Sequence, residues 1–128
     1  MRLLLDSHAL IWWWIESPRL SRAARTVLTA PENDIFVSTA SVWEIATKYR
    51  VGKLPEIEDL EGDYDPLMAR NAFISLPVTE VHAMKAGLLP GEHRDPFDRM
   101  IAAQALIAQP TVVTVDPALA AFGCAVIW

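Results

Sequence analysis

The sequence predicts an α/β fold in which a central, mainly parallel sheet lies between helices. Short apolar runs of strand length alternate along the chain with longer segments of helical periodicity. The strand-like runs are almost continuously apolar, which is typical of parallel strands that helices cover on both faces. With 128 residues the chain has the size of one ordinary domain, so we expect a single domain over residues 1–128.

Four segments are expected to form strands, and a weaker candidate lies between the second and the third. In chain order these are Arg2–Leu5, Ile35–Val37, the weaker Phe73–Ile74, Val112–Val115 and Ala125–Trp128. Arg2–Leu5 is followed directly by Asp6 and Val112–Val115 by Asp116, so an acid stands at the end of two predicted strands.

Helical periodicity accounts for most of the remaining chain. The expected helices begin at Ser7 and then cover Leu20–Leu28, Ser41–Tyr49, Pro66–Ala72, Thr79–Leu88 and Pro96–Ala108. The stretch Val51–Asp65 is rich in acids, Gly and Pro, and we expect a loop or short helices there.

The composition limits the classes of function. The single Cys124 excludes a disulfide framework and a cysteine-based zinc site, which suits a reducing cytoplasm. No secretory signal is recognisable, and no apolar run approaches the roughly 20 residues that span a bilayer, so we expect no membrane contact. The net charge of −5 is unfavourable for binding nucleic acid, unless cations lie between the protein's acids and the phosphates.

Four acids from distant parts of the sequence are expected at one edge of the sheet. Asp6 and Asp116 follow strands, and functional groups of open parallel sheets gather beyond the carboxyl ends of the strands. Glu44 falls in the first turn of the helix after the second strand. Asp98 falls in the first turn of Pro96–Ala108, just before the apolar stripe of that helix, and should therefore point inward.

Each acid also has a purely local interpretation. Asp6, Asp95 and Asp116 each precede an expected helix and can serve as its N-cap, and for Asp95 we favour this role. The segment Ser41–Glu44 fits a capping box, and Glu44 with Lys48 fits a surface ion pair one helical turn apart.

Carboxylates gathered at one edge repel one another, so the site should contain raised pKa values or a bound cation. Magnesium prefers oxygen ligands and commonly bridges protein carboxylates and phosphate groups. The four acids therefore predict a magnesium site, with Asp98 as the acid that is hardest to explain otherwise, because an unpaired inward-facing charge is costly.

Four motifs in order resemble the PIN-domain toxins of the VapC type, and together they span nearly the whole chain. They are Leu3–Trp13 (LLLDSHALIWW), Ser41–Ala46 with Lys48–Arg50 and Gly52–Leu54, His93–Ala105 (HRDPFDRMIAAQA), and Thr114–Asp116 with the ending Val126–Trp128. The segment around Asp95-Pro96-Phe97-Asp98 is the most specific of them.

The resemblance implies a PIN fold, a three-layer α/β/α sandwich, and a metal-dependent endoribonuclease that acts as the toxin of a type II toxin–antitoxin pair. On that pattern Asp6 and Asp98 are the main ligands of Mg²⁺, for which Mn²⁺ substitutes, and Glu44 and Asp116 complete the acidic quartet. The implied partners are an RNA substrate, a cognate antitoxin that often places a basic side chain among the acids, and a second copy of the chain in a homodimer.

The resemblance also assigns supporting positions. Thr114 matches a hydroxyl position beside the metal, and Asp95 matches an additional acid of this branch. Ser7 stands where the family usually has Thr and keeps the hydroxyl group.

Other residues are candidates for contact with RNA. His8 and His93 lie near the predicted edge, whereas His82 is expected to be structural. The basic side chains that could contact phosphate are Arg19, Arg22, Arg25, Lys48, Arg50, Arg94 and Arg99. Three consecutive residues, Trp12–Trp14, cannot share one helix face, so they serve either packing or an interface with a dimer partner or antitoxin. Trp43 is expected in the core.

Two other functions remain open at this level. A phospho-acceptor receiver domain has this length and a doubly wound sheet, although Ser7 stands where its second acid would follow Asp6. The second is a PIN fold used only as a binding module. All four acids are present, so nothing in the sequence marks the site as inactive.

Overall fold

Five parallel strands form the centre of the computed structural model, which describes residues 1–128. They are β1 (Arg2–Leu5), β2 (Asp34–Ser38), β3 (Ile74–Leu76), β4 (Thr111–Val113) and β5 (Val126–Ile127). Their order across the sheet is β3-β2-β1-β4-β5, and every neighbouring pair is parallel. The predicted central sheet is therefore confirmed, including the weaker third strand.

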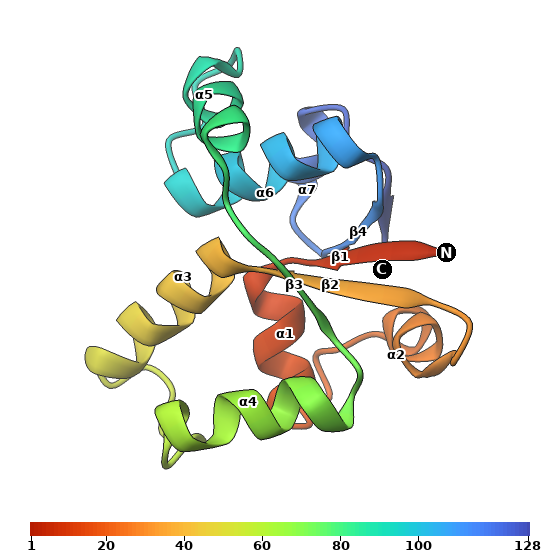
Figure 1. The fold of residues 1–128 in the computed structure, drawn as a ribbon, viewed down its shortest axis with the longest axis vertical. Helices are drawn as coiled ribbons and strands as arrows, with labels where there is room; N and C mark the ends of the chain where they lie inside the picture. The colour runs from red at the N-terminus through yellow and green to blue at the C-terminus, as the bar shows by residue number, and fades with distance from the viewer.

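Seven helices cover the two faces of this sheet. They are α1 (Ser7–Trp14), α2 (Arg22–Thr29), α3 (Thr39–Arg50), α4 (Leu60–Arg70), α5 (Glu80–Leu88), α6 (Pro96–Ala108) and α7 (Pro117–Ala121). Figure 1 shows α5, α6 and α7 on one side of the sheet and α1 to α4 on the other. This is the three-layer α/β/α sandwich that the sequence predicted. None of the helices has the length and apolar content needed to cross a bilayer.

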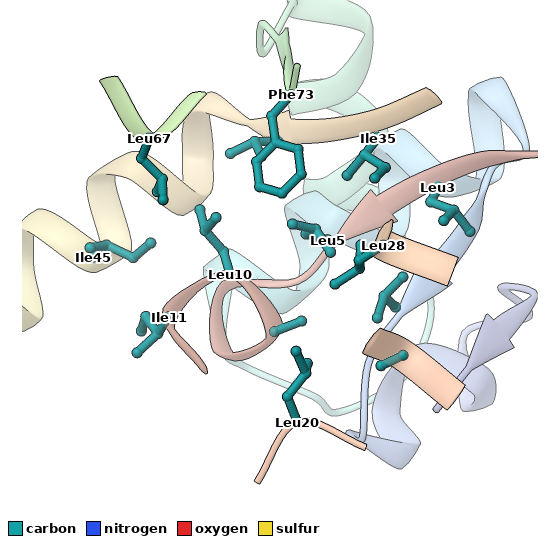
Figure 2. Close-up of a cluster of buried hydrophobic side chains, with 14 of the residues drawn as sticks. Leu3, Leu5, Leu10, Ile11, Leu20, Leu28, Ile35, Ile45, Leu67 and Phe73 are labelled. Atoms are coloured by element: carbon teal, nitrogen blue, oxygen red, sulfur yellow. The ribbon is translucent and has the colours of Figure 1, made fainter. Parts of the chain in front are cut away.

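The central strand β1 joins two apolar clusters. Leu3 and Leu5 belong to a cluster of 16 buried residues on the side of α1 to α4 (Figure 2), whereas Leu4 belongs to a cluster of six on the side of α6 and α7. All three leucines are fully buried. Because side chains alternate along a strand, one apolar strand can support both layers. The polar residue that follows Leu5 is therefore held at a fixed position by the core.

The strand order also determines where the sheet is expected to have its ligand-binding crevice. The chain runs outward from β1 through β2 and β3, and then returns to add β4 and β5 on the other side of β1. Ligands of open α/β sheets bind beyond the carboxyl ends of the strands at the point where the order reverses, which here lies between β1 and β4. Receiver domains have the order 2-1-3-4-5 instead, so this topology excludes the receiver interpretation.

Several boundaries differ from the prediction because other residues cap the helices. Helix α3 begins at Thr39, since the hydroxyl of Ser38 accepts from the amide of Ala40 at 3.1 Å. The alternative interpretation of Ser41–Glu44 as a capping box was therefore wrong. Helix α4 begins at Leu60, because the carboxylate of Asp59 accepts a hydrogen bond from the amide of Gly62 at 3.0 Å. The helix includes Pro66, at which the sequence predicted it to begin.

The three consecutive tryptophans pack against three different parts of the fold. Their rings lie beside those of other aromatic residues, with centroid distances of 5.6 Å for Trp12–Trp128, 6.2 Å for Trp13–Phe73 and 6.1 Å for Trp14–Tyr64. All three are half-buried against the larger apolar cluster. The packing interpretation accounts for these contacts.

The prediction that Trp43 lies in the core was wrong. Its side chain is 65% exposed on α3 and meets the ring of Phe97, in the first turn of α6, edge-on at 4.9 Å. Helix α3 projects away from the sheet (Figure 1), so only part of its surface faces the core.

Candidate active site

Asp6 lies at the carboxyl end of β1 and is 4% exposed. One carboxylate oxygen accepts a hydrogen bond from the amide of Ala9 at 2.7 Å, so Asp6 is the N-cap of α1. The other accepts from the hydroxyl of Thr114. Burial raises the pKa of Asp6, the two hydrogen bonds and the charge of His8 oppose this, and the charge of Asp116 raises it further. The predicted cap and the predicted site residue are thus the same carboxylate.

Thr114 connects the ends of the two central strands. β1 and β4 pair with Leu5 beside Val113, so the residues that follow them meet at the carboxyl edge. The Thr114 hydroxyl donates to Asp6 and accepts from the amide of Asp116 at 2.9 Å. Asp116 in turn caps α7 by accepting from the amide of Ala118 at 2.8 Å. One hydroxyl therefore sets the spacing between two of the predicted acids.

Asp98 is the third residue of α6, whose N-cap is Asp95. The Asp95 carboxylate accepts from the amides of Phe97 and Asp98, as expected for a cap. The carboxylate of Asp98 lies 2.9 Å from Nε2 of His93, and its side chain is 22% exposed. Burial raises the pKa of Asp98 to about 6, the hydrogen bond from His93 opposes this, and the charges of Asp95 and Asp116 add to the rise.

Asp6, Asp98 and Asp116 therefore share one electrostatic neighbourhood. The charge of Asp116 raises the pKa of both Asp6 and Asp98, although the three residues come from different parts of the chain. We call these three residues the acidic rim. Two of them, Asp6 and Asp116, follow the ends of β1 and β4, where the strand order reverses.

Glu44, the fourth predicted acid, lies on α3, and its carboxylate contacts none of the three rim residues. Because α3 begins at Thr39, Glu44 is in the second turn of the helix and not in the first, as had been predicted. It is 9% exposed, and its carboxylate pairs with the ammonium of Lys48 at 2.9 Å. The predicted ion pair of Glu44 with Lys48 is therefore present. A hydrogen bond of 3.1 Å between the hydroxyls of Ser7 and Ser41 joins α3 to α1 nearby.

The donor set of the acidic rim fits a hard divalent cation. All its donors are carboxylate oxygens, with the Thr114 hydroxyl beside them, and such oxygen sets are preferred by Mg²⁺ and Mn²⁺. Burial and mutual repulsion disfavour the ionised forms of Asp6 and Asp98, a cost that a cation would offset. No three acidic, His or Cys side chains are grouped closely enough to hold an ion together.

Arg99 has a different environment from the one predicted for a phosphate contact. Its guanidinium donates to the carbonyl oxygens of Ala86 at 2.9 Å, His93 at 2.8 Å and Gly87 at 3.5 Å, and also to that of Leu89. These carbonyls belong to the end of α5 and the loop before α6. Arg99 therefore fastens this loop, and with it His93, to the first turn of α6.

The sequence of the loop before α6 contains one signal for this role of Arg99. The loop between α5 and α6 contains Pro90 and Gly91, and the carbonyls of such a loop have no regular partners. An arginine in the next helix is suited to satisfy several of them at once, since it has five donors.

His82 is structural as predicted: its ring accepts from the amide of Thr79 at 3.0 Å in a capping box.

Comparisons with known proteins agree with the fold and with the earlier resemblance. A curated relative, ribonuclease VapC16 of Mycobacterium tuberculosis, is 38% identical over 69 residues, which are 51% of this chain and about half, 49%, of the relative. The VapBC2 complex of Rickettsia felis, bound to a DNA fragment of its promoter, contains a chain that matches with a TM-score of 0.72 and 18% identity, covering 99% of this chain and 98% of that one. The FitAcB structure of Neisseria gonorrhoeae matches with a TM-score of 0.68 and 24% identity, over 98% and 96% of the two chains.

At these identities the structural matches establish the fold. The assignment to a family comes from the sequence, because the family model described as PIN domain matches residues 3–123, nearly the full length. The chain belongs to the PIN domain family.

Proposed function

We propose that this chain is a magnesium-dependent endoribonuclease and the toxin of a type II toxin–antitoxin pair. The observation that carries the proposal is the acidic rim: the Thr114 hydroxyl links Asp6 to Asp116 where the strand order reverses, and burial together with the charge of Asp116 raises the pKa of both Asp6 and Asp98. Perturbed carboxyl groups in such a crevice are typical of functional sites. The partial match to a ribonuclease adds support.

Each rim residue has a distinct part in the proposed site. Asp6 and Asp98 are the main metal ligands, and Asp116 and Glu44 complete the acidic set. Thr114 and the amide of Ala9 hold both oxygens of Asp6 in place, and His93 orients Asp98. A bound Mg²⁺ or Mn²⁺ would supply positive charge beside a phosphodiester and polarise its P–O bonds.

The proposed partners follow from the family and from the site. The structural relatives include toxin–antitoxin complexes, VapBC2 among them and another from Klebsiella pneumoniae. We propose that a cognate antitoxin binds this chain and blocks the acidic rim with a basic side chain, and that the chain works in the cytoplasm as a homodimer. An acidic rim is the kind of surface that a guanidinium recognises well.

The proposal is tested by incubating the purified protein with total RNA and sequencing the newly formed ends. Magnesium should produce ends at a small set of positions, and a chelator should abolish them, because the rim acids act through a divalent cation. Cleavage that persists in the chelator would contradict the proposal, and intact RNA under both conditions would favour a PIN fold that serves only for binding.

The toxin assignment has its own test in cells. Induced expression should arrest growth, and the arrest should disappear with Asp6→Ala, which removes a rim carboxylate. If the Asp6→Ala protein also arrests growth at equal expression, the toxicity does not come from RNA cleavage at the acidic rim, and the toxin assignment is contradicted.

A further inference from the structure

Lys48 is held beside the candidate active site by two side chains from different helices. Its ammonium lies 2.9 Å from the carboxylate of Glu44 and 3.4 Å from Nε2 of His8, the second residue of α1. The Lys48 side chain is 26% exposed, so it is neither buried nor free in solvent. The ammonium has three donors, and these two contacts leave one that can point outward.

The surroundings of His8 fix this position further. The ring of His8 lies against Trp12, with 5.5 Å between centroids, and Trp12 lies against Trp128 at the end of the chain. His8 lies in the first turn of α1, whose N-cap is Asp6, so its contact with Lys48 joins the ammonium to the start of this helix. The ammonium of Lys48 is thus held near the acids by packed groups.

A cationic side chain beside the acidic rim would help an acidic protein to bind RNA. The net charge is −5, and unscreened carboxylates at the rim repel the phosphates of the substrate. Arg99, the basic residue that follows Asp98, already donates to four carbonyl oxygens. Arg25 donates to the carbonyl of Ser17 and belongs to α2, which Figure 1 places on the side where the strands begin.

We propose that Lys48 binds a phosphate of the RNA strand beside the bond that is cleaved, with Glu44 and His8 holding its ammonium in place. This inference rests on the proposed ribonuclease function. It differs from the ordinary interpretation of Glu44 and Lys48 as a surface ion pair, which predicts a small effect on stability and none on RNA.

The test measures how RNA binding depends on salt. A fluorescent single-stranded RNA is titrated with the Asp98→Asn protein, which should bind without cleaving, at constant magnesium and several potassium chloride concentrations. Each phosphate contact on a single strand contributes about 0.7 to the slope of log affinity against log salt. Adding Lys48→Gln should therefore reduce the slope by about 0.7, whereas Lys48→Arg should keep it.

Lys53→Gln is the matched control, because it removes the same charge from an exposed lysine just after α3. It should leave the slope unchanged, and all variants should melt near the temperature of the parent. An unchanged slope in Lys48→Gln, or an equal decrease in Lys53→Gln, would overturn the role of Lys48 while leaving the ribonuclease proposal intact. If the wild-type protein leaves RNA uncut and the Asp98→Asn protein does not bind it, both proposals fail.

Discussion

Replacing Asp6 or Asp98 by asparagine is expected to lower the rate of RNA cleavage more than about 100-fold. Loss of residues that merely orient metal ligands commonly costs roughly 10–100-fold, so loss of a ligand should cost more. Asparagine keeps the size of the side chain but removes the negative charge that a divalent cation requires. The rate is measured with a defined RNA in single-turnover reactions at saturating magnesium.

The fold should survive both changes. Asparagine is as good an N-cap as aspartate, and its carbonyl can accept from the amide of Ala9 in place of the Asp6 carboxylate. Asp59→Asn is a matched control, since Asp59 caps α4 in the same manner outside the candidate site. Full activity of both the Asp6→Asn and the Asp98→Asn proteins would contradict the carboxylate mechanism.

Asp98→Asn is also expected to stabilise the metal-free protein near neutral pH. The pKa of Asp98 is raised from 3.8 to about 6 by burial and by the charges of Asp95 and Asp116, against the hydrogen bond and charge of His93. The folded state therefore binds the proton of this carboxyl more tightly than the unfolded chain does. The stabilisation from this group is complete below about pH 4 and is lost as the pH rises through 6.

Asparagine is neutral and does not titrate. The free energy of unfolding of the Asp98→Asn protein should therefore exceed that of the wild type by an amount that grows as the pH rises through 6. The expected gain at neutral pH is on the order of 2 kcal/mol in the free energy of unfolding. Urea denaturation at a series of pH values, in a chelator, measures it. The exposed Asp63 on α4 provides the control Asp63→Asn. A difference between wild type and Asp98→Asn that does not change with pH would show that the titration of Asp98 is not linked to folding.

Where a candidate site residue directly follows a buried strand, the sequence predicted its position in the fold well. Leu3–Leu5 can only be a buried strand, and Asp6 must then emerge at its carboxyl end. Asp116 was predicted less exactly: the strand expected to end at Val115 ends at Val113, so two residues separate β4 from Asp116. Such inferences succeed because strand position is determined by burial, and burial is visible in the pattern of apolar residues.

The sequence was less informative where helix caps or long-range contacts determine the position of a side chain. Ser38 and Ser41 are equally plausible caps in sequence, and the choice of Ser38 moved Glu44 from the first turn to the second. The exposure of Trp43 depends on the direction in which α3 leaves the sheet. The hydrogen bond of Thr114 to Asp6 joins residues that are 108 positions apart, a distance over which no local pattern operates.

The central claim, that Asp6 and Asp98 hold a divalent cation at the carboxyl edge of the sheet, is tested most directly by thermal unfolding with and without metal. A ligand that binds only the folded state stabilises it by about 2.7 kcal/mol at 100 times its dissociation constant. Millimolar Mg²⁺ or Mn²⁺ should therefore raise the melting temperature of the wild-type protein by several degrees, and should raise that of Asp6→Asn and Asp98→Asn far less. An equal rise in all three proteins, or no rise in the wild type, would contradict the claim.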